Sequence, residues 1–417
     1  MIDQIKLQTK QLIVFLLVLA GGSSQGQNTV SPYSIFGPGE IQNKGFGTNK
    51  GMGGAGIALE SGNYLNNLNP ASYAGMDSLR LIVELGLEGK AYGINTSKDS
   101  YTGFNANLAY LALGFKYTPW LAGSFGVVPF SSIGYSIDRI NYVEGLNQPY
   151  TSNYVGSGGI SQFYFSNAAR LGKHLSLGAT VSYMFGSLIQ EENLEQTDVV
   201  PDIMIERKDY LRSMYFDFGL QYKFSTQRQT YSMGVTYAFE QSLNSNHIVN
   251  LYNSSSTLLQ GYSEKTDYLV VPQIIGAGFG VKGKRYSLAL DYTFQGWAGI
   301  SYPIQYNEFV DSHKFAMGME LNPWDHRAIN SFYKNWTYRF GVNYESSYLT
   351  FGNSTIKDRS VTLGLGIPLY GALSKIDFSV TGGINGTVSN KLIQEKYLMF
   401  NVGVSLNEIA FIKRKID

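Results

Sequence analysis

The chain has 417 residues, of which 15% are charged, against about 25% in ordinary soluble domains. Its 32 Lys and Arg residues balance 31 Asp and Glu residues, which excludes the strongly basic surface typical of a nucleic-acid-binding protein. There is no cysteine, which excludes disulfide scaffolds, thiolate metal sites and cysteine nucleophiles.

Residues 1–26 are typical of a secretory signal peptide. Lys6 and Lys10 precede an apolar run over 12–20, and small residues follow up to Gly26. The apolar run is too short to cross about 30 Å of hydrocarbon as a helix, so a membrane anchor is disfavoured. Because no cysteine follows it, a lipoprotein anchor is excluded. The sequence therefore predicts an exported protein that is cleaved near Gly26.

Residues 27–78 lack the alternation of a strand and are rich in glycine. Glycine allows tight turns and close backbone approach where neither regular helix nor sheet fits. We therefore interpret this segment as a compact plug ahead of the strands that follow. The segment contains Gly53 and Gly54 in a glycine-rich run, and later the sequence Asn69, Pro70 and Ala71.

Residues 79–412 form about fourteen segments in which apolar and polar residues alternate. In 286–296 the even positions are apolar or aromatic, whereas the odd positions are small or polar, and 336–345 repeats the pattern. Successive side chains of a strand point to opposite faces, so each segment predicts one strand with one apolar face. A mean hydropathy of -0.11 fits this averaging of two faces.

The composition of the polar face indicates which solvent the apolar face meets. A soluble sandwich or β-helix, which is the alternative, shows many Lys and Glu residues to water. Here the second face is mainly Gly, Ser, Thr, Asn and Gln, and the apolar face carries Tyr and Trp toward the strand ends. This arrangement is typical of a lipid-facing barrel with a polar interior. We therefore predict an all-β fold, a transmembrane antiparallel barrel of about 14 strands with the plug inside its lumen.

An even number of strands places both termini at the periplasmic end of such a barrel. We expect periplasmic turns at 172–173, 283–284 and 371–372, where the links are short. We expect outer loops near 137–154, 193–202, 244–262 and 322–331, where the links are longer.

The third strand contains Pro129, which has no N–H and cannot complete a central β-ladder. With Gly126 and Gly134 nearby, this strand is expected to bend or bulge. The pattern leaves open whether the bend is a harmless bulge or an opening in the wall. Pro272 marks a second candidate bulge, so proline alone does not identify an opening.

The signal peptide, the glycine-rich segment, Asn69-Pro70-Ala71 and about fourteen strands together resemble the FadL outer-membrane transport family, most closely its Bacteroidetes-type branch. The resemblance implies that the plug is a hatch and that hydrophobic ligands leave sideways at a kinked third strand. It thereby implies a lateral opening at Gly126, Pro129 and Gly134. The basic tail 413–417 departs from a barrel that ends on an aromatic residue, which leaves open how the assembly machinery reads this end.

Motifs for other chemistry are weak. Gly51–Gly56 formally matches G-x-G-x-x-G, but no βαβ unit surrounds it, and the four histidines lack metal-ligand spacing. We predict no catalytic residue, no metal site, no cofactor and no enzyme activity. Charges inside the barrel, among them Asp291 and Arg339, are expected to pair inside the barrel. The alternative is that Arg339 and Asp291 bind a ligand, with a ligand carboxylate at Arg339.

The sequence thus favours an outer-membrane channel for passive uptake of hydrophobic or amphipathic small molecules. The alternative is a non-transporting accessory barrel that serves protein secretion or outer-membrane assembly. The expected partners are outer-membrane lipids, a hydrophobic ligand, the barrel-assembly machinery and another envelope protein, with no nucleic acid. The predicted division is a signal peptide at 1–26, a plug at 27–78, a barrel at 79–412 and a tail at 413–417.

Overall fold

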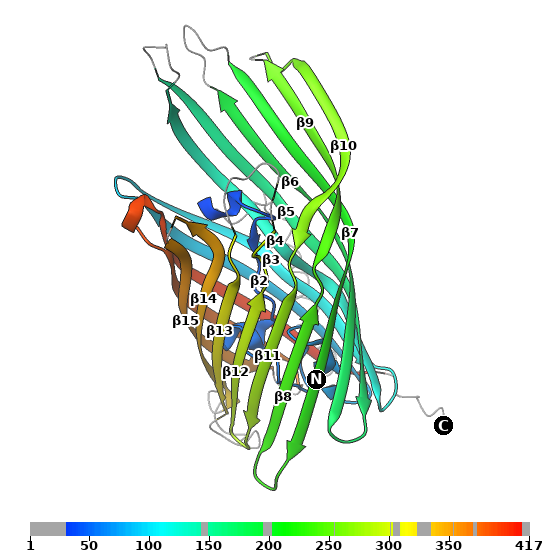
Figure 1. Cartoon of the computed structure of the whole chain (residues 1–417). Helices are drawn as coiled ribbons and strands as arrows, with labels where there is room; N and C mark the ends of the chain where they lie inside the picture. The colour runs from blue at the N-terminus through cyan, green and yellow to red at the C-terminus, as the bar shows by residue number, and fades with distance from the viewer. Residues whose placement is uncertain are drawn as a thin grey trace, which may run out of the picture.

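A computed structural model describes residues 31–142, 149–194, 202–253, 255–300, 302, 309–322, 335–352, 354–369 and 373–410 (Figure 1). The predicted signal peptide and the basic tail lie outside the described residues. Among the described residues, no helix is long and apolar enough to span a bilayer.

Fourteen antiparallel strand paths close into a barrel, because the last strand pairs with the first. Two paths are interrupted once and carry two labels each, β8 with β9 and β10 with β11. The strands are β2 (Arg80–Asn95), β3 (Ser100–Lys116), β4 (Leu121–Asn141), β5 (Tyr150–Leu171), β6 (Leu175–Leu194), β7 (Ile203–Ser225), β8 (Thr230–Ala238), β9 (Gln241–Asn253), β10 (Leu258–Val271), β11 (Ile274–Lys282), β12 (Tyr286–Gln295), β13 (Ser312–Leu321), β14 (Thr337–Phe351), β15 (Ser354–Pro368), β16 (Lys375–Gly386) and β17 (Gln394–Ile409). The predicted 14-stranded all-β barrel is therefore confirmed.

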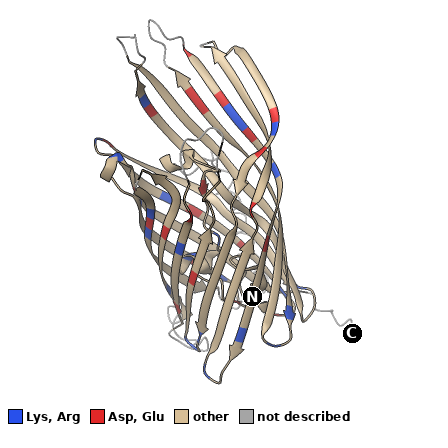
Figure 2. Ribbon diagram, viewed as in Figure 1, with Lys and Arg blue, Asp and Glu red and all other residues tan. Residues whose placement is uncertain are grey.

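The outer face of the barrel is apolar, as the alternation predicts. Leu290, Val342, Val361 and Leu398 lie on four different strands and are all exposed. The residues that alternate with them are buried and polar, among them Asn343 on β14. Figure 2 shows few charges on the lower strands and more on the upper parts of the long ones. An apolar outer band around a polar interior is the requirement for strands that cross a bilayer.

The connections correct part of the sequence prediction. β13 is the tenth strand path, so it ends at Leu321 on the side of the barrel where β2 begins and β17 ends. The prediction of an outer loop at 322–331 is therefore wrong, although residues 323–331 themselves lie outside the described residues. Strand parity fixes the side of a link whatever its length. The predicted loop 244–262 is mostly β9 and β10, which continue as paired strands beyond the apolar band.

The barrel wall is split toward the end that is remote from the termini. β10 pairs there only with β9. The upper part of β4 pairs with a barrel strand, β5, on one edge only. Figure 1 shows β7, β9 and β10 rising above the strands of the opposite wall, with β12 to β15 ending lower. The upper part of the barrel is therefore a tall sheet facing a shorter one.

The N-terminal segment, residues 31–78, lies inside the barrel and is called the plug below. It contains η1 (Pro32–Ile35), β1 (Glu40–Ile41), α2 (Gly47–Gly51) and η2 (Pro70–Gly75). Outside the plug, a short turn η4 (Ser389–Lys391) precedes the last barrel strand. Phe46, Leu65 and Tyr73 of the plug pack against Tyr110 and Tyr164 of the wall. The lumen of a barrel this wide is thus filled by chain as well as by side chains.

Glycines on the inner wall make room for the plug. A Cβ atom on Gly178 would lie 2.3 Å from the amide nitrogen of Ala71, and one on Gly219 would lie 2.0 Å from Oδ1 of Asn69. A Cβ on Gly341 would lie 2.2 Å from the nitrogen of Gly53. The plug and the wall therefore approach each other at backbone distance, which only glycine allows.

We expect Gly219→Ala to displace the Asn69 turn, because the added methyl group overlaps its side chain. Overpacking of this kind costs about 1–3 kcal/mol of unfolding free energy. Trypsin cleavage of the plug after Lys44, in protein folded in micelles, should accelerate. Gly93→Ala is the control, because its nearest atom would be 3.8 Å away. Equal cleavage of the two variants would contradict a tightly seated plug.

Candidate functional site

A cavity of about 440 Å³ lies between the plug and the barrel wall. Its apolar lining includes Phe46 and Ile57 of the plug together with Tyr110, Phe130 and Tyr215 of the wall. Its volume is in the range of small-molecule sites, which are mostly apolar with a few placed polar groups.

Charged groups line the same cavity. Nζ of Lys44 lies 3.4 Å from a carboxylate oxygen of Asp217, and Lys50 forms an ion pair with Glu88. Lys44 keeps about a third of its side-chain surface exposed, so its pair with Asp217 is loose. The cavity can therefore hold an apolar body and contact a polar group at its edge.

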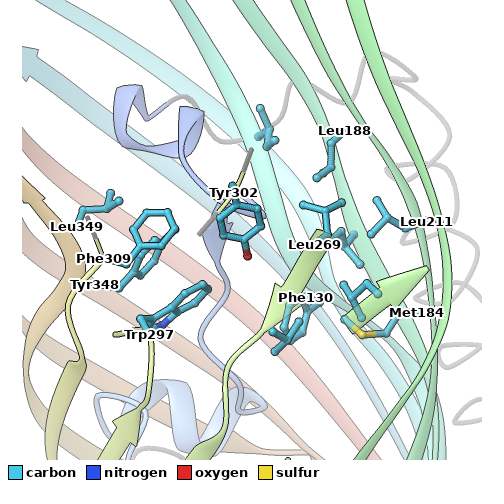
Figure 3. Packing of buried hydrophobic residues seen from close by; sticks show 14 of the residues in the cluster. Phe130, Met184, Leu188, Leu211, Leu269, Trp297, Tyr302, Phe309, Tyr348 and Leu349 are labelled. Carbon is cyan, nitrogen blue, oxygen red and sulfur yellow. The ribbon is translucent and has the colours of Figure 1, made fainter. Parts of the chain in front are cut away.

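An aromatic cluster lies above the cavity, toward the end of the barrel that is remote from the termini (Figure 3). The rings of Trp297 and Tyr348 stack with centroids 4.1 Å apart, and Phe309 meets both edge-on. Figure 3 shows Phe130 and Leu211 on the facing wall. Phe130 belongs both to this apolar cluster and to the cavity lining, so the two regions are continuous.

The hydroxyl of Tyr33 anchors the plug at this level. It donates a hydrogen bond to the carbonyl of Ile393 at 2.5 Å. Burial raises the pKa of Tyr33 to about 12, although the amide of Ile393, which donates to the Tyr33 oxygen at 3.3 Å, acts in the opposite direction. The hydroxyl therefore stays protonated across the physiological pH range and keeps donating.

Backbone pairing between two wall strands stops beside the cavity. β3 and β4 pair only from Leu111 with Val127 to Lys116 with Ala122. Beyond that point, Ser100–Tyr110 of β3 and Val128–Asn141 of β4 are not paired with each other. We call this unpaired stretch the seam. Leu108 and Pro129, from its two sides, both line the cavity.

The plug covers the β4 side of the seam. Glu40 and Ile41 pair antiparallel with Ser132 and Ser131, and the amide of Gln42 donates to the carbonyl of Phe130 at 2.9 Å. Further along, the amide of Ser31 donates to the carbonyl of Gly134. The hydroxyl of Ser34 donates to the same carbonyl and accepts a bond from the amide of Gly134. The plug thus supplies hydrogen bonds that β3 would otherwise make.

The three residues predicted at a lateral opening lie on this strand with different environments. The ladder with β5 shifts register between Pro129 and Ser131, so the expected bulge is confirmed. Gly126 is still paired with β3, and a Cβ there would lie 2.3 Å from the carbonyl oxygen of Leu111. Gly134 is bonded to the plug. Lateral passage itself stays a prediction.

The predicted Asn-Pro-Ala turn ties the plug to the wall. The side chain of Asn69 accepts a bond from the amide of Ala71 at 3.0 Å and donates to the carbonyls of Ile57 and Leu220. Pro70 begins η2. Gly53 and Gly54 both have positive φ and form the turn after α2, with Gly53 against β14. Whether this plug moves stays a prediction.

The two predicted ligand-binding charges are already engaged within the protein. Arg339 is buried and lies 2.7 Å from both Glu320 and Asp377. Asp291 accepts the amides of Gly56 and Ile57 at 2.6 and 2.8 Å. Asp291 lines the cavity, whereas Arg339 does not. Arg339 therefore joins strands of the wall, whereas Asp291 ties the plug to the wall, and ligand binding by them stays a prediction.

Sequence reasoning missed the aromatic cluster and the buried group of Lys90, Glu395 and Glu40. Nζ of Lys90 lies 2.6 Å from Glu395 and 3.6 Å from Glu40. Tyr348 continues the outward pattern of 336–345, and Trp297 follows the end of β12, so no local signal places either ring inside the barrel. Within the described residues, no group of His, Asp and Glu side chains could hold a metal ion.

These features define a transmembrane β-barrel of outer-membrane type, with fourteen strands and an N-terminal segment in its lumen. The family model described as BamG matches residues 6–417, so the chain belongs to the BamG family. No curated protein is detectably similar in sequence.

Solved structures with this fold have low sequence identity to the chain. The toluene transporter TbuX of Ralstonia pickettii is 16% identical, with 87% of this chain and 98% of that chain covered and a TM-score of 0.60. The toluene transporter TodX of Pseudomonas putida is also 16% identical, with 89% and 100% covered and a TM-score of 0.58. The monoaromatic hydrocarbon channel CymD is 16% identical, with 88% of this chain and 98% of that chain covered and a TM-score of 0.58. The resemblance to FadL-type barrels is confirmed at the level of the fold.

We expect Arg339→Ala to destabilise the barrel strongly, because it removes the cation that Glu320 and Asp377 share and leaves Asp377 with Lys375 at 3.3 Å. Breaking one partner of a buried ion pair costs about 3–5 kcal/mol. The urea midpoint of the micelle-folded protein should fall accordingly. Lys98→Ala, in an exposed turn, is the control and should change the free energy of unfolding by less than about 0.5 kcal/mol. An unchanged midpoint for Arg339→Ala would contradict the structural role of the ion pair.

Proposed function

We propose that the protein is an outer-membrane channel for passive uptake of hydrophobic or amphipathic small molecules. The observation that carries the proposal is the continuity between the aromatic cluster and a cavity that reaches the seam. An apolar molecule would partition first among Trp297, Tyr348 and Phe309 and then into the cavity. It would leave at the seam after the plug shifts.

The balance of forces supports a passive mechanism. Apolar surface leaving water supplies the driving force for entry, and neither ATP nor a reactive group is needed. The polar bonds between plug and wall, such as those of Asn69 and Asp291, would have to yield for passage. Three proteins whose structures share the fold carry names of toluene or hydrocarbon transporters, which supports the choice of ligand class.

We infer that residues 1–26 are removed on export, that 27–78 act as the hatch, that 79–412 cross the outer membrane and that 413–417 form a basic tail. The apolar outer face supports the membrane location, and outer-membrane lipids are the partners that it would contact. Chain ends of such barrels face the periplasm.

Asn107→Trp should lower the uptake of toluene at least about tenfold, because Asn107 lines the cavity beside the seam and the larger ring fills it. Ala106→Trp is the matched control, since the neighbouring side chain is exposed on the outer face. The measurement is toluene uptake in cells that depend on this barrel, normalised to folded protein in the membrane. Equal uptake by the two variants would refute passage through this cavity.

Membership of the BamG family favours a second candidate, an accessory barrel that works with the barrel-assembly machinery. The tall sheet of β4, β5, β6, β7, β9 and β10 supports it, because sheet edges exposed beyond the membrane are able to bind other proteins. Mass spectrometry of gently extracted protein separates the two functions. A stable envelope-protein partner without toluene uptake would support the second candidate, and uptake without a partner would exclude it.

A further inference from the structure

We propose that the seam accepts an extended strand of another protein, one that alternates apolar and polar side chains as a membrane-barrel strand does. The proposal goes beyond small-molecule uptake and does not depend on it, because it rests on backbone pairing at the edge of β3.

The edge of β3 is free over eleven residues. β3 pairs with β2 in unbroken register from Ser100 to Leu108, and the register shifts between Leu108 and Tyr110, so most of the segment is held as a regular strand. Within the described residues, no backbone hydrogen bond joins this stretch to β4. A straight strand with one unpaired edge is the template to which an incoming strand adds.

The free edge lies at the level of the apolar outer band. Phe104 shares one cross-strand row with apolar or glycine residues of four neighbouring strands, Ala91, Leu398, Gly382 and Val361. Phe104, Leu398 and Val361 are all exposed on the outer face. Unpaired backbone groups are costly in hydrocarbon, so an edge at this depth favours a partner that pairs with it.

The opposite edge of the seam shows which kind of chain fits there. The plug binds β4 as an extended segment at Glu40 and Ile41, in antiparallel pairing. This segment covers the edge of β4 from the inside and does not reach the backbone of β3. The site that remains is therefore the edge of β3, and its geometry requires a strand.

The side chains of β3 define the chemistry of the strand. Phe104 and Leu108 face outward, whereas Asn105 and Asn107 face the lumen. In a sheet, side chains of paired residues lie on the same face, so the added strand must be apolar outward and polar inward. Asn105 is only 6% exposed, and its Nδ2 donor has no hydrogen-bond partner. A polar inward side chain of the added strand would satisfy it.

The test uses single cysteines, since the chain has none of its own. The probe is a synthetic peptide that copies residues 395–408 of this chain, a strand with the required alternation, and carries either Phe400→Cys or Asn401→Cys. The full-length protein in lipid vesicles carries Phe104→Cys, or Val361→Cys as control. Both positions lie in one row of the outer face, but β15 is paired on both edges. Asn105→Cys reports the inner face.

We expect disulfide formation at Phe104→Cys with the Phe400→Cys peptide to be at least tenfold faster than at Val361→Cys. We also expect Asn105→Cys to prefer the Asn401→Cys peptide, because inward residues pair with inward residues. Equal rates at Phe104→Cys and Val361→Cys would overturn the proposal, since the peptide would then only partition into lipid.

A dodecyl maleimide probe separates this proposal from small-molecule release. If the maleimide labels Phe104→Cys while the peptide forms no disulfide there, the seam admits small apolar molecules only, and strand binding is refuted. If strand binding is observed while Asn107→Trp leaves toluene uptake unchanged, the proposed uptake function fails and strand binding stands.

Discussion

The pairing of backbone polar groups at bilayer depth is the constraint on which this structure depends. Hydrocarbon offers no hydrogen bonds, so a spanning sheet has to close on itself, and here β17 closes it by pairing with β2 along their full lengths. The seam is the departure from closure. On one of its sides the plug replaces the missing strand, which gives the N-terminal segment a second role besides filling the lumen.

The contacts inside the barrel divide into two kinds. The plug is seated by polar bonds and glycine contacts, such as those of Asn69 with Leu220 and of Glu60 with Arg170 and Lys223. The region above it is held by apolar and aromatic packing around Trp297 and Tyr348. The cavity lies between these regions and combines their chemistry. A barrel that only sealed the membrane would have no need for this graded interior, which is why uptake is the function that the geometry supports best.

Much of the fold could be predicted from the sequence. The period-2 pattern located fourteen strands, and the interruptions at Pro129 and Pro272 followed from the missing N–H of proline. Asn69 was singled out through the family resemblance, whereas the inner-wall glycines that contact the plug, such as Gly178 and Gly219, were not predicted. The side of the link after Leu321 was predicted wrongly, because its length was weighed above strand parity.

The candidate site was less predictable. Arg339 and Asp291 were expected to pair inside the barrel, but their partners Asp377, Gly56 and Ile57 could not be named, because these residues lie far away in the sequence. The seam depends on where β3 and β4 stop pairing, and this register cannot be read from either strand alone. The aromatic cluster requires Trp297, from the segment after β12, to meet Tyr348 of β14. Each of these features is a long-range contact, for which a single sequence holds no local signal.

Amide hydrogen exchange of the full-length protein in lipid bilayers tests the central claim most directly. In Ser100–Tyr110, the amides that point to the unpaired edge of β3 should exchange much faster than the amides of Ser354–Pro368. The reason is that β15 is paired on both edges. Protection of the two segments to the same extent would mean that the wall is continuous at β3, and it would contradict the account of the seam.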